Sequence, residues 1–206
     1  MSELLFEAET HTYWHAGKRV PGVTAVLEQL QHLQGVPWEV LKAAQVFGTH
    51  VHMACDLYNR GELDEEALDP HLMPYLEGYK RFLGETGFTV TASEQRLFNR
   101  KLLYAGTADL FGTWKGTTWV VDLKSGVVPS TVGAQLAAYQ NAAAEKPRRR
   151  LCVQLSPGDY RLFEQKDPGD FSLFLSALNC YRHNLKHNPG KFDHADQSRR
   201  FENTAA

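Results

Sequence analysis

The sequence predicts an α/β fold with a central mixed sheet. Up to Thr86, apolar residues recur mainly with helical spacing, and β-prone pieces are short. From Phe88 onward, successive β-prone segments are separated by turn residues, and one helical segment divides them from further strands. Strands framed by helices in this order are typical of a sheet covered by helices.

The first part of the chain is predicted to form a hairpin and helices. The turn signal Ala16-Gly17-Lys18 separates β-prone pieces, so residues 4–20 are expected to form a small hairpin. Thr24 is expected to cap the helix that follows. The expected helices cover residues 24–34, 38–58 and 65–86, with breaks at Gly35-Val36-Pro37, Asn59-Arg60-Gly61, Pro70 and Pro74.

The second part is predicted to contain the sheet. We expect three successive strands, a helix, one or two further strands and a last helix. Ser130 is placed to cap the helix between the strands. The expected strands cover residues 88–98, 103–114, 117–123, 151–155 and 160–164, and the expected helices cover residues 132–145 and 171–185.

Length and composition favour one domain. A chain of 206 residues with 43% hydrophobic residues can bury one core, so we expect a single domain over residues 1–190. Its predicted parts are a hairpin and helix (1–36), a helical region (37–86), a sheet core (87–165) and a C-terminal helix (166–188), before a flexible tail (189–206). The sequence shows neither a long apolar span nor the layout of a secretion signal. We therefore expect a cytoplasmic protein without a membrane anchor.

Charge and cysteine content exclude some classes of protein. The formal net charge of −2 disfavours a simple nucleic-acid coat protein, which usually has a basic surface. Two compact basic groups, Arg96 with Arg100 and Lys101, and Arg148 to Arg150, are equally consistent with phosphate contacts and with solvated surface. The three cysteines lie far apart, which predicts free thiols and excludes a four-cysteine zinc or iron–sulfur site.

An acid and a lysine end the most apolar predicted strand. In Val120-Val121-Asp122-Leu123-Lys124, residues two apart share a face, so Asp122 and Lys124 project together. Burying both charges is costly unless they pair or bind a ligand. A structural ion pair explains this motif as well as a reactive site does.

Asp109 provides a second acid. It lies on the preceding predicted strand in Gly106-Thr107-Ala108-Asp109, where hairpin pairing would set it beside Asp122. Adjacent carboxylates repel unless a proton or a cation lies between them, and Mg²⁺ and Mn²⁺ prefer such oxygen ligands. Taken alone, Asp109 is equally an ordinary acid at a strand edge.

Two helical motifs add polar side chains. Gly48-Thr49-His50-Val51-His52 places two histidines on a predicted helix, facing different ways, and spacing does not choose between them. Gln135 and Tyr139 are four residues apart, so they share a helix face and can address a nucleotide or order a site. A polar face on a surface helix is the alternative for this pair.

Together, these motifs resemble the RecB-like branch of the PD-(D/E)XK nuclease superfamily. The ordered set is G-x-x-x-H at Gly48 to His52, GT-x-D ending at Asp109, D-x-K at Asp122 to Lys124, and Q-x-x-x-Y at Gln135 to Tyr139. The opening, with His11-x-Tyr13 and Val20 to Thr24, is similar to phage-type and mitochondrial single-domain exonucleases of this branch. The resemblance implies a restriction-endonuclease-like core of helix, three strands, helix and strand.

The resemblance also implies roles for individual residues. His52, Asp109, Asp122 and the Leu123 carbonyl would bind Mg²⁺ or Mn²⁺. Lys124 would position or activate the attacking water and stabilise developing charge. Gln135 and Tyr139 would be accessory residues, and Glu94 on the first strand would have a supporting role.

The resemblance implies a metal-dependent deoxyribonuclease, with an exonuclease favoured, in recombination, repair or phage DNA metabolism. The substrate would be single-stranded DNA or duplex ends, with a recombinase, annealing protein or helicase as a possible partner. The iron–sulfur cluster of some relatives is not expected here, and the sequence has no helicase phosphate loop. Two alternatives stay open: a non-catalytic nucleic-acid-binding module of a larger complex, and a metal hydrolase of small phosphoesters.

Overall fold

A five-stranded mixed sheet forms the centre of the protein. The computed structural model describes residues 3–7, 10–30 and 37–188. The strand order is β4-β5-β6-β7-β8, in which β6 and β7 are parallel and the other neighbours are antiparallel. The strands are β4 (Thr89–Asn99), β5 (Tyr104–Trp114), β6 (Thr117–Lys124), β7 (Arg149–Ser156) and β8 (Asp159–Glu164).

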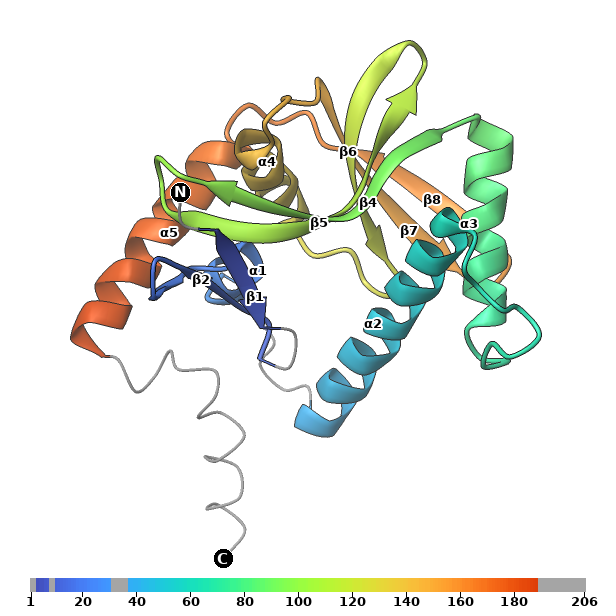
Figure 1. Cartoon of the computed structure of the whole chain (residues 1–206), viewed down its shortest axis with the longest axis horizontal. Coiled ribbons are helices and arrows are strands. Elements are labelled where there is room, and N and C mark those ends of the chain that lie inside the picture. The colour runs from blue at the N-terminus through green and yellow to red at the C-terminus, as the bar shows by residue number, and fades with distance from the viewer. Residues whose placement is uncertain (1–2, 8–9, 31–36, 189–206) are drawn as a thin grey trace, which may run out of the picture.

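Helices cover both faces of this sheet (Figure 1). One apolar core joins the sheet to α1, α4 and α5, and a second core joins its other face to α2 and α3. The helices are α1 (Val23–Glu28), α2 (Trp38–Arg60), α3 (Met73–Thr86), α4 (Val132–Ala142) and α5 (Asp170–His187). The order of α3, three strands, α4 and β7 confirms the predicted α/β fold class and is consistent with a restriction-endonuclease-like core.

Strand β6 lies between the two cores and carries the D-x-K motif at its end. Trp119, Val121 and Leu123 point into the α2–α3 side, whereas Val120 points into the α4–α5 side. By alternation, Asp122 and Lys124 follow Val120 onto the α4–α5 side. The apolar residues of β6 thus fix where these two charged groups emerge.

The N-terminal segment is a three-stranded meander and not the predicted simple hairpin. Its strands are β1 (Leu4–Glu7), β2 (Thr12–His15) and β3 (Lys18–Val20), in the order β1-β2-β3. The turn between β2 and β3 falls at the predicted Ala16-Gly17. The extra strand is β1, which pairs antiparallel with all four residues of β2. It satisfies backbone groups of β2 on the edge that faces away from β3.

Both predicted helix caps were wrong by one or two residues. The Ala105 N–H donates to the Pro21 carbonyl (2.9 Å), and Gly22 forms a bridge with Ala105. This pairing holds the chain extended up to Gly22, so α1 begins at Val23 and Thr24 lies inside its first turn. In α4 the cap position belongs to Thr131 instead of Ser130, because a turn from Pro129 to Val132 precedes the helix.

Other boundaries moved for local reasons. Residues 65–72 precede α3 in turns, and Pro74 lies in its first turn, where a missing N–H costs nothing. Helix α4 ends at Ala142 because the following chain must reach the start of β6, where the Arg148 N–H donates to the Thr118 carbonyl. The first helix was predicted to run to about Gln34 but ends at Glu28, in a turn in which the Leu30 N–H donates to the Leu27 carbonyl. Gln34 itself and the tail after residue 188 lie outside the described residues. None of the described helices is long and apolar enough to cross a membrane.

Two glycines of α3 give a matched test of packing against the sheet. A Cβ at Gly78 would lie 2.5 Å from the Asp159 carbonyl oxygen and 2.9 Å from that of Ser156, and backbone atoms cannot rotate away. We expect Gly78→Ala to lower the free energy of unfolding by about 1–3 kcal/mol. A Cβ at Gly84 meets no heavy atom of the described residues within 4 Å, so Gly84→Ala should raise the free energy by about 0.5–1 kcal/mol.

Urea unfolding of the two variants and the parent protein checks this prediction. Equal effects of the two substitutions would contradict the close packing of α3 on the β7–β8 turn.

Candidate active site

The site forms where β5 separates from β6. The two strands pair from Trp114–Thr117 to Leu110–Val121, and the described ladder stops there. One step further, Asp109 would stand opposite Asp122. The Asp109 carboxylate instead accepts a hydrogen bond from the Leu123 N–H (2.6 Å). Asp109 therefore closes the fork between the strands with its side chain.

His52 approaches Asp109 from α2. Its Nδ1 lies 3.4 Å from the other carboxylate oxygen of Asp109. Burial would lower the pKa of the His52 imidazole, but the charge and hydrogen bond of Asp109 outweigh burial and raise that pKa to about 9. Burial would likewise raise the pKa of Asp109, but His52, Lys124 and the Leu123 N–H together lower it. Without a metal, the two residues form an imidazolium–carboxylate pair.

Glu94 is the third member of this group. The β4–β5 register runs from Ser93–Leu110 to Gln95–Ala108, which places Glu94 opposite Asp109. Glu94 has a left-handed backbone, with φ of 46°. Partial burial, and then the negative charge of Asp109, raise the pKa of its carboxyl group to about 7.

His52, Glu94 and Asp109 fit a divalent cation. One donor atom from each lies within 4.8 Å of the donors of the other two. An imidazole with two carboxylates suits Mn²⁺ or Mg²⁺, and a cation between the acids would relieve their repulsion. The structure thus brings Glu94, predicted only as a supporting residue, into the donor group.

Asp122 and Lys124 form an ion pair beside this group. The Lys124 ammonium lies 3.0 Å and 2.8 Å from the two oxygens of Asp122, which is fully buried. Burial raises the pKa of Asp122 against the opposing charge of Lys124. Burial would lower the pKa of Lys124, but Asp122 and Asp109 reverse this and raise it. The predicted shared face of these two residues is confirmed, whereas a ligand role for Asp122 or the Leu123 carbonyl stays a prediction.

Gln135 and Tyr139 share a face of α4, as predicted. The Gln135 amide donates to the Tyr139 hydroxyl (3.1 Å), and the Tyr139 side chain is buried. Burial raises the pKa of the Tyr139 hydroxyl well above its ordinary value, so this group stays neutral. Its ring packs on β5 at Gly106, where a Cβ would lie only 2.6 Å from Tyr139 Cε1. Glycine is therefore required for α4 to approach the fork so closely.

The sequence motifs did not predict two supporting contacts. The Tyr13 hydroxyl of β2 lies 2.9 Å from Thr107 Oγ1, which attaches the meander two residues before Asp109. The Ser93 hydroxyl donates to Asp56 (2.5 Å), which links β4 to α2 next to Glu94. A helix-spacing signal was present for the second contact, because Asp56 is four residues after His52 and shares its helix face.

Comparisons with known proteins give fold-level likenesses only. No protein-family model and no curated protein sequence matches the chain. The crystal structure of LHK-Exo in complex with dAMP matches with 11% identity and a TM-score of 0.40, over 87% of this chain and 92% of that chain. The crystal structure of SSO0001 matches with 14% identity and a TM-score of 0.34, over 76% of this chain and 80% of that chain. The side chains of the site therefore carry the evidence for function.

The His52–Asp109 pair predicts that the metal-free protein loses stability as the pH rises. The folded-state pKa of His52 is about 9, raised from 6.5, so the folded chain holds this proton more tightly than the unfolded chain. The contribution of protonated His52 to the free energy of unfolding is complete below pH 6.5 and is lost as the pH rises through about 9. The free energy of unfolding in EDTA should fall across this range.

Urea titrations of the parent, His52→Gln and His50→Gln proteins test this dependence. The fall should be smaller in His52→Gln and unchanged in His50→Gln. The same slope in all three proteins would show that the His52–Asp109 pair does not control it.

Proposed function

We propose that this protein is a metal-dependent nuclease that hydrolyses phosphodiester bonds of DNA. The observation that carries the proposal is the convergence of His52, Glu94 and Asp109 next to the Asp122–Lys124 ion pair. The ordered motifs that resemble RecB-like nucleases support the same reading. We favour an exonuclease acting on single-stranded or end-exposed DNA in recombination, repair or phage DNA metabolism.

The metal would be held by the donor group and by residues that the resemblance adds. His52, Glu94 and Asp109 supply the donor atoms that already lie together, and the resemblance adds Asp122 and the Leu123 carbonyl. When bound, Mg²⁺ or Mn²⁺ supplies charge neutralisation at the phosphate and lowers the pKa of a bound water. The hydrogen bond from the Leu123 N–H orients the Asp109 carboxylate for metal binding.

Lys124 acts as a charged group and not as a base. Its raised pKa keeps the ammonium protonated, so it does not accept a proton from water. An ammonium at this position stabilises negative charge that develops on the phosphate during hydrolysis. Asp122 holds it there through contacts of 2.8–3.0 Å, which restricts a side chain that is otherwise flexible.

Gln135 and Tyr139 contribute neutral hydrogen-bonding groups. Because the Tyr139 hydroxyl stays protonated, it adds no negative charge beside the Asp109 and Asp122 carboxylates. The Gln135 amide keeps the hydroxyl in one orientation. We assign the pair a positioning role at the fork.

The first prediction from this proposal concerns the cleavage of DNA. End-labelled linear DNA, single- and double-stranded, is incubated beside closed circular DNA with Mg²⁺, Mn²⁺ or EDTA, and Asp122→Asn is the inactive control. We expect metal-dependent loss of linear DNA that spares circles and is absent in Asp122→Asn.

Other results identify the alternatives. Cleavage of circles would replace the exonuclease with an endonuclease. Binding without cleavage of any DNA would favour a nucleic-acid-binding module. Hydrolysis of nucleotide-sized phosphoesters without attack on polymers would favour a small-substrate hydrolase.

The second prediction separates the metal-binding residues from Lys124. His52→Ala and Glu94→Gln should raise the Mn²⁺ concentration needed for half-maximal cleavage, because each removes a donor. Lys124→Ala should lower the maximal rate by about 10²–10³-fold at any metal concentration, since it removes transition-state charge stabilisation.

Two matched variants control for general damage. His50→Ala changes a histidine that lines another surface of α2 with Trp38 and Phe47. Glu77→Gln changes an exposed acid on α3. Both should behave like the parent protein. A Lys124→Ala enzyme that regains full rate with added Mn²⁺ would contradict the role assigned to the lysine.

A further inference from the structure

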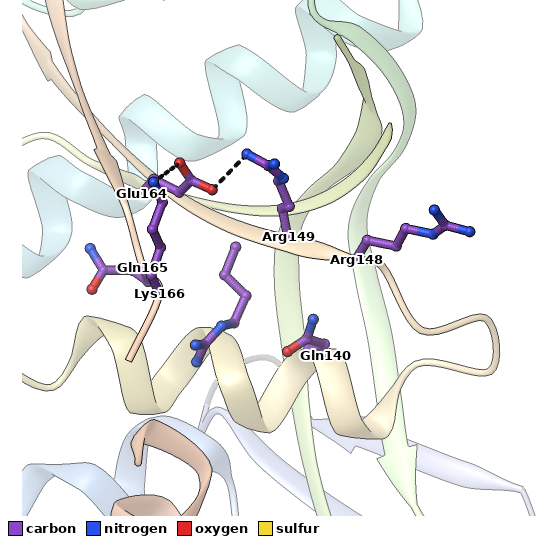
Figure 2. A pocket seen from close by; sticks show the side chains of 7 residues that line it. Gln140, Arg148, Arg149, Glu164, Gln165 and Lys166 are labelled. Atoms are coloured by element: carbon purple, nitrogen blue, oxygen red, sulfur yellow. Dashed lines mark hydrogen bonds and ion pairs between the residues drawn. The ribbon is translucent and has the colours of Figure 1, made fainter. Parts of the chain in front are cut away.

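A basic cavity of about 480 Å³ lies where β7 begins and β8 ends. Its walls include Gln140 of α4, Arg148, Arg149 and Arg150 of the β7 start, and Glu164 and Lys166 at the end of β8 (Figure 2). The formal charge of the whole chain is −2, so this local concentration of cations is not the general composition of the surface.

The cavity is separate from the proposed metal centre. In the parallel β6–β7 register, Arg149 stands beside Trp119, whereas Asp122 stands beside Cys152. These two levels are three residues apart, which is about 10 Å along a strand. A group bound in the cavity therefore does not share the donors of His52, Glu94 and Asp109.

One carboxylate holds two of the cations at the cavity. Glu164 accepts contacts from Arg149 (3.0 Å) and from Lys166 (3.0 Å), one on each oxygen, as the dashed lines of Figure 2 mark. An arginine has five N–H donors and a lysine has three, so one shared carboxylate leaves most of these donors unused. Both cations stay accessible, with side-chain exposures of 53% and 73%.

The other two arginines differ in their roles. Arg150 is buried, and it contacts Asp170 (2.9 Å) and the Gly133 and Asp167 carbonyls, so its charge stabilises the packing of α4 and α5 on the sheet. Arg148 is exposed, and among the residues that the structure describes none forms an ion pair with its side chain. Figure 2 shows the Arg148 side chain extended away from Glu164. The cavity lining thus includes three exposed cations, Arg148, Arg149 and Lys166, and one acid, Glu164.

We propose that this cavity binds a phosphate group. Guanidinium and ammonium groups bind phosphate oxygens through charge-assisted hydrogen bonds, and a polar cavity with surplus N–H donors provides no match for an apolar ligand. The phosphate belongs either to a nucleic-acid backbone outside the metal centre or to a free phosphate compound. The first case rests on the proposed nuclease function, and the second does not.

Binding measured in EDTA tests the cavity without involving metal or cleavage. The probes are a fluorescent oligothymidylate of about 20 nucleotides, followed by anisotropy, and inorganic phosphate, followed by the thermal unfolding midpoint at constant ionic strength. The test variant is Arg148→Ala/Lys166→Ala. The control, Lys18→Ala/Lys186→Ala, removes the same charge from exposed positions on the meander and on α5.

We expect the cavity variant to weaken oligonucleotide binding by about tenfold at low salt and to reduce its salt dependence, with less than about a twofold change in the control. The rise in unfolding midpoint with phosphate should also disappear only in the cavity variant. Arg148→Lys/Lys166→Arg keeps both charges and should bind like the parent protein.

Each outcome decides between the two phosphate sources or overturns the site. Loss of both responses in the cavity variant supports a backbone phosphate, and loss of the inorganic phosphate response alone supports a free phosphate compound. Equal behaviour of the cavity and control variants with both probes overturns the proposal. Because no step requires cleavage, an inactive protein that passes this test would contradict only the nuclease function.

Discussion

The hydrogen bond from the Leu123 N–H to Asp109 is the contact on which the site depends. It replaces the ladder bond that β5 and β6 would otherwise share beyond Leu110 and Val121. A strand pair that simply separated would leave buried backbone groups without partners, which costs free energy. The side chain of Asp109 satisfies one of these groups and keeps its second oxygen for His52. The separation of β5 and β6 therefore leaves the Leu123 N–H satisfied and also positions Asp109 in the donor group.

The spacing of the Gly106-Thr107-x-Asp109 motif follows from this fork. Three neighbouring segments converge within four positions of one strand: the Tyr139 ring at Gly106, the Tyr13 hydroxyl at Thr107 and His52 at Asp109. The meander, α4 and α2 thus each contact the same short stretch of β5. A displacement of β5 would move all three contacts together, which explains why a small residue, a hydroxyl and an acid occur in this order.

The sequence predicted the parts of the site that depend on regular geometry. Strand alternation placed Asp122 with Lys124, and helix periodicity placed Gln135 with Tyr139, because both rules follow from backbone repeats. Local spacing did not choose between His50 and His52, since that choice depends on how α2 lies on the sheet. The caps at Thr24 and Ser130 failed because tertiary pairing at Pro21 and a turn at Pro129 overrode local propensity.

The left-handed backbone of Glu94 was also beyond the reach of sequence patterns, and it constrains which residues this position can accept. A residue with a Cβ pays on the order of 1 kcal/mol for a φ of 46°. Asparagine and aspartate tolerate this conformation better than glutamate, but their side chains are one methylene shorter. Backbone preference and side-chain reach therefore select different residues at position 94. Substitutions that relax the chain there withdraw the carboxylate from His52 and Asp109, so local stability and the donor group are in direct competition.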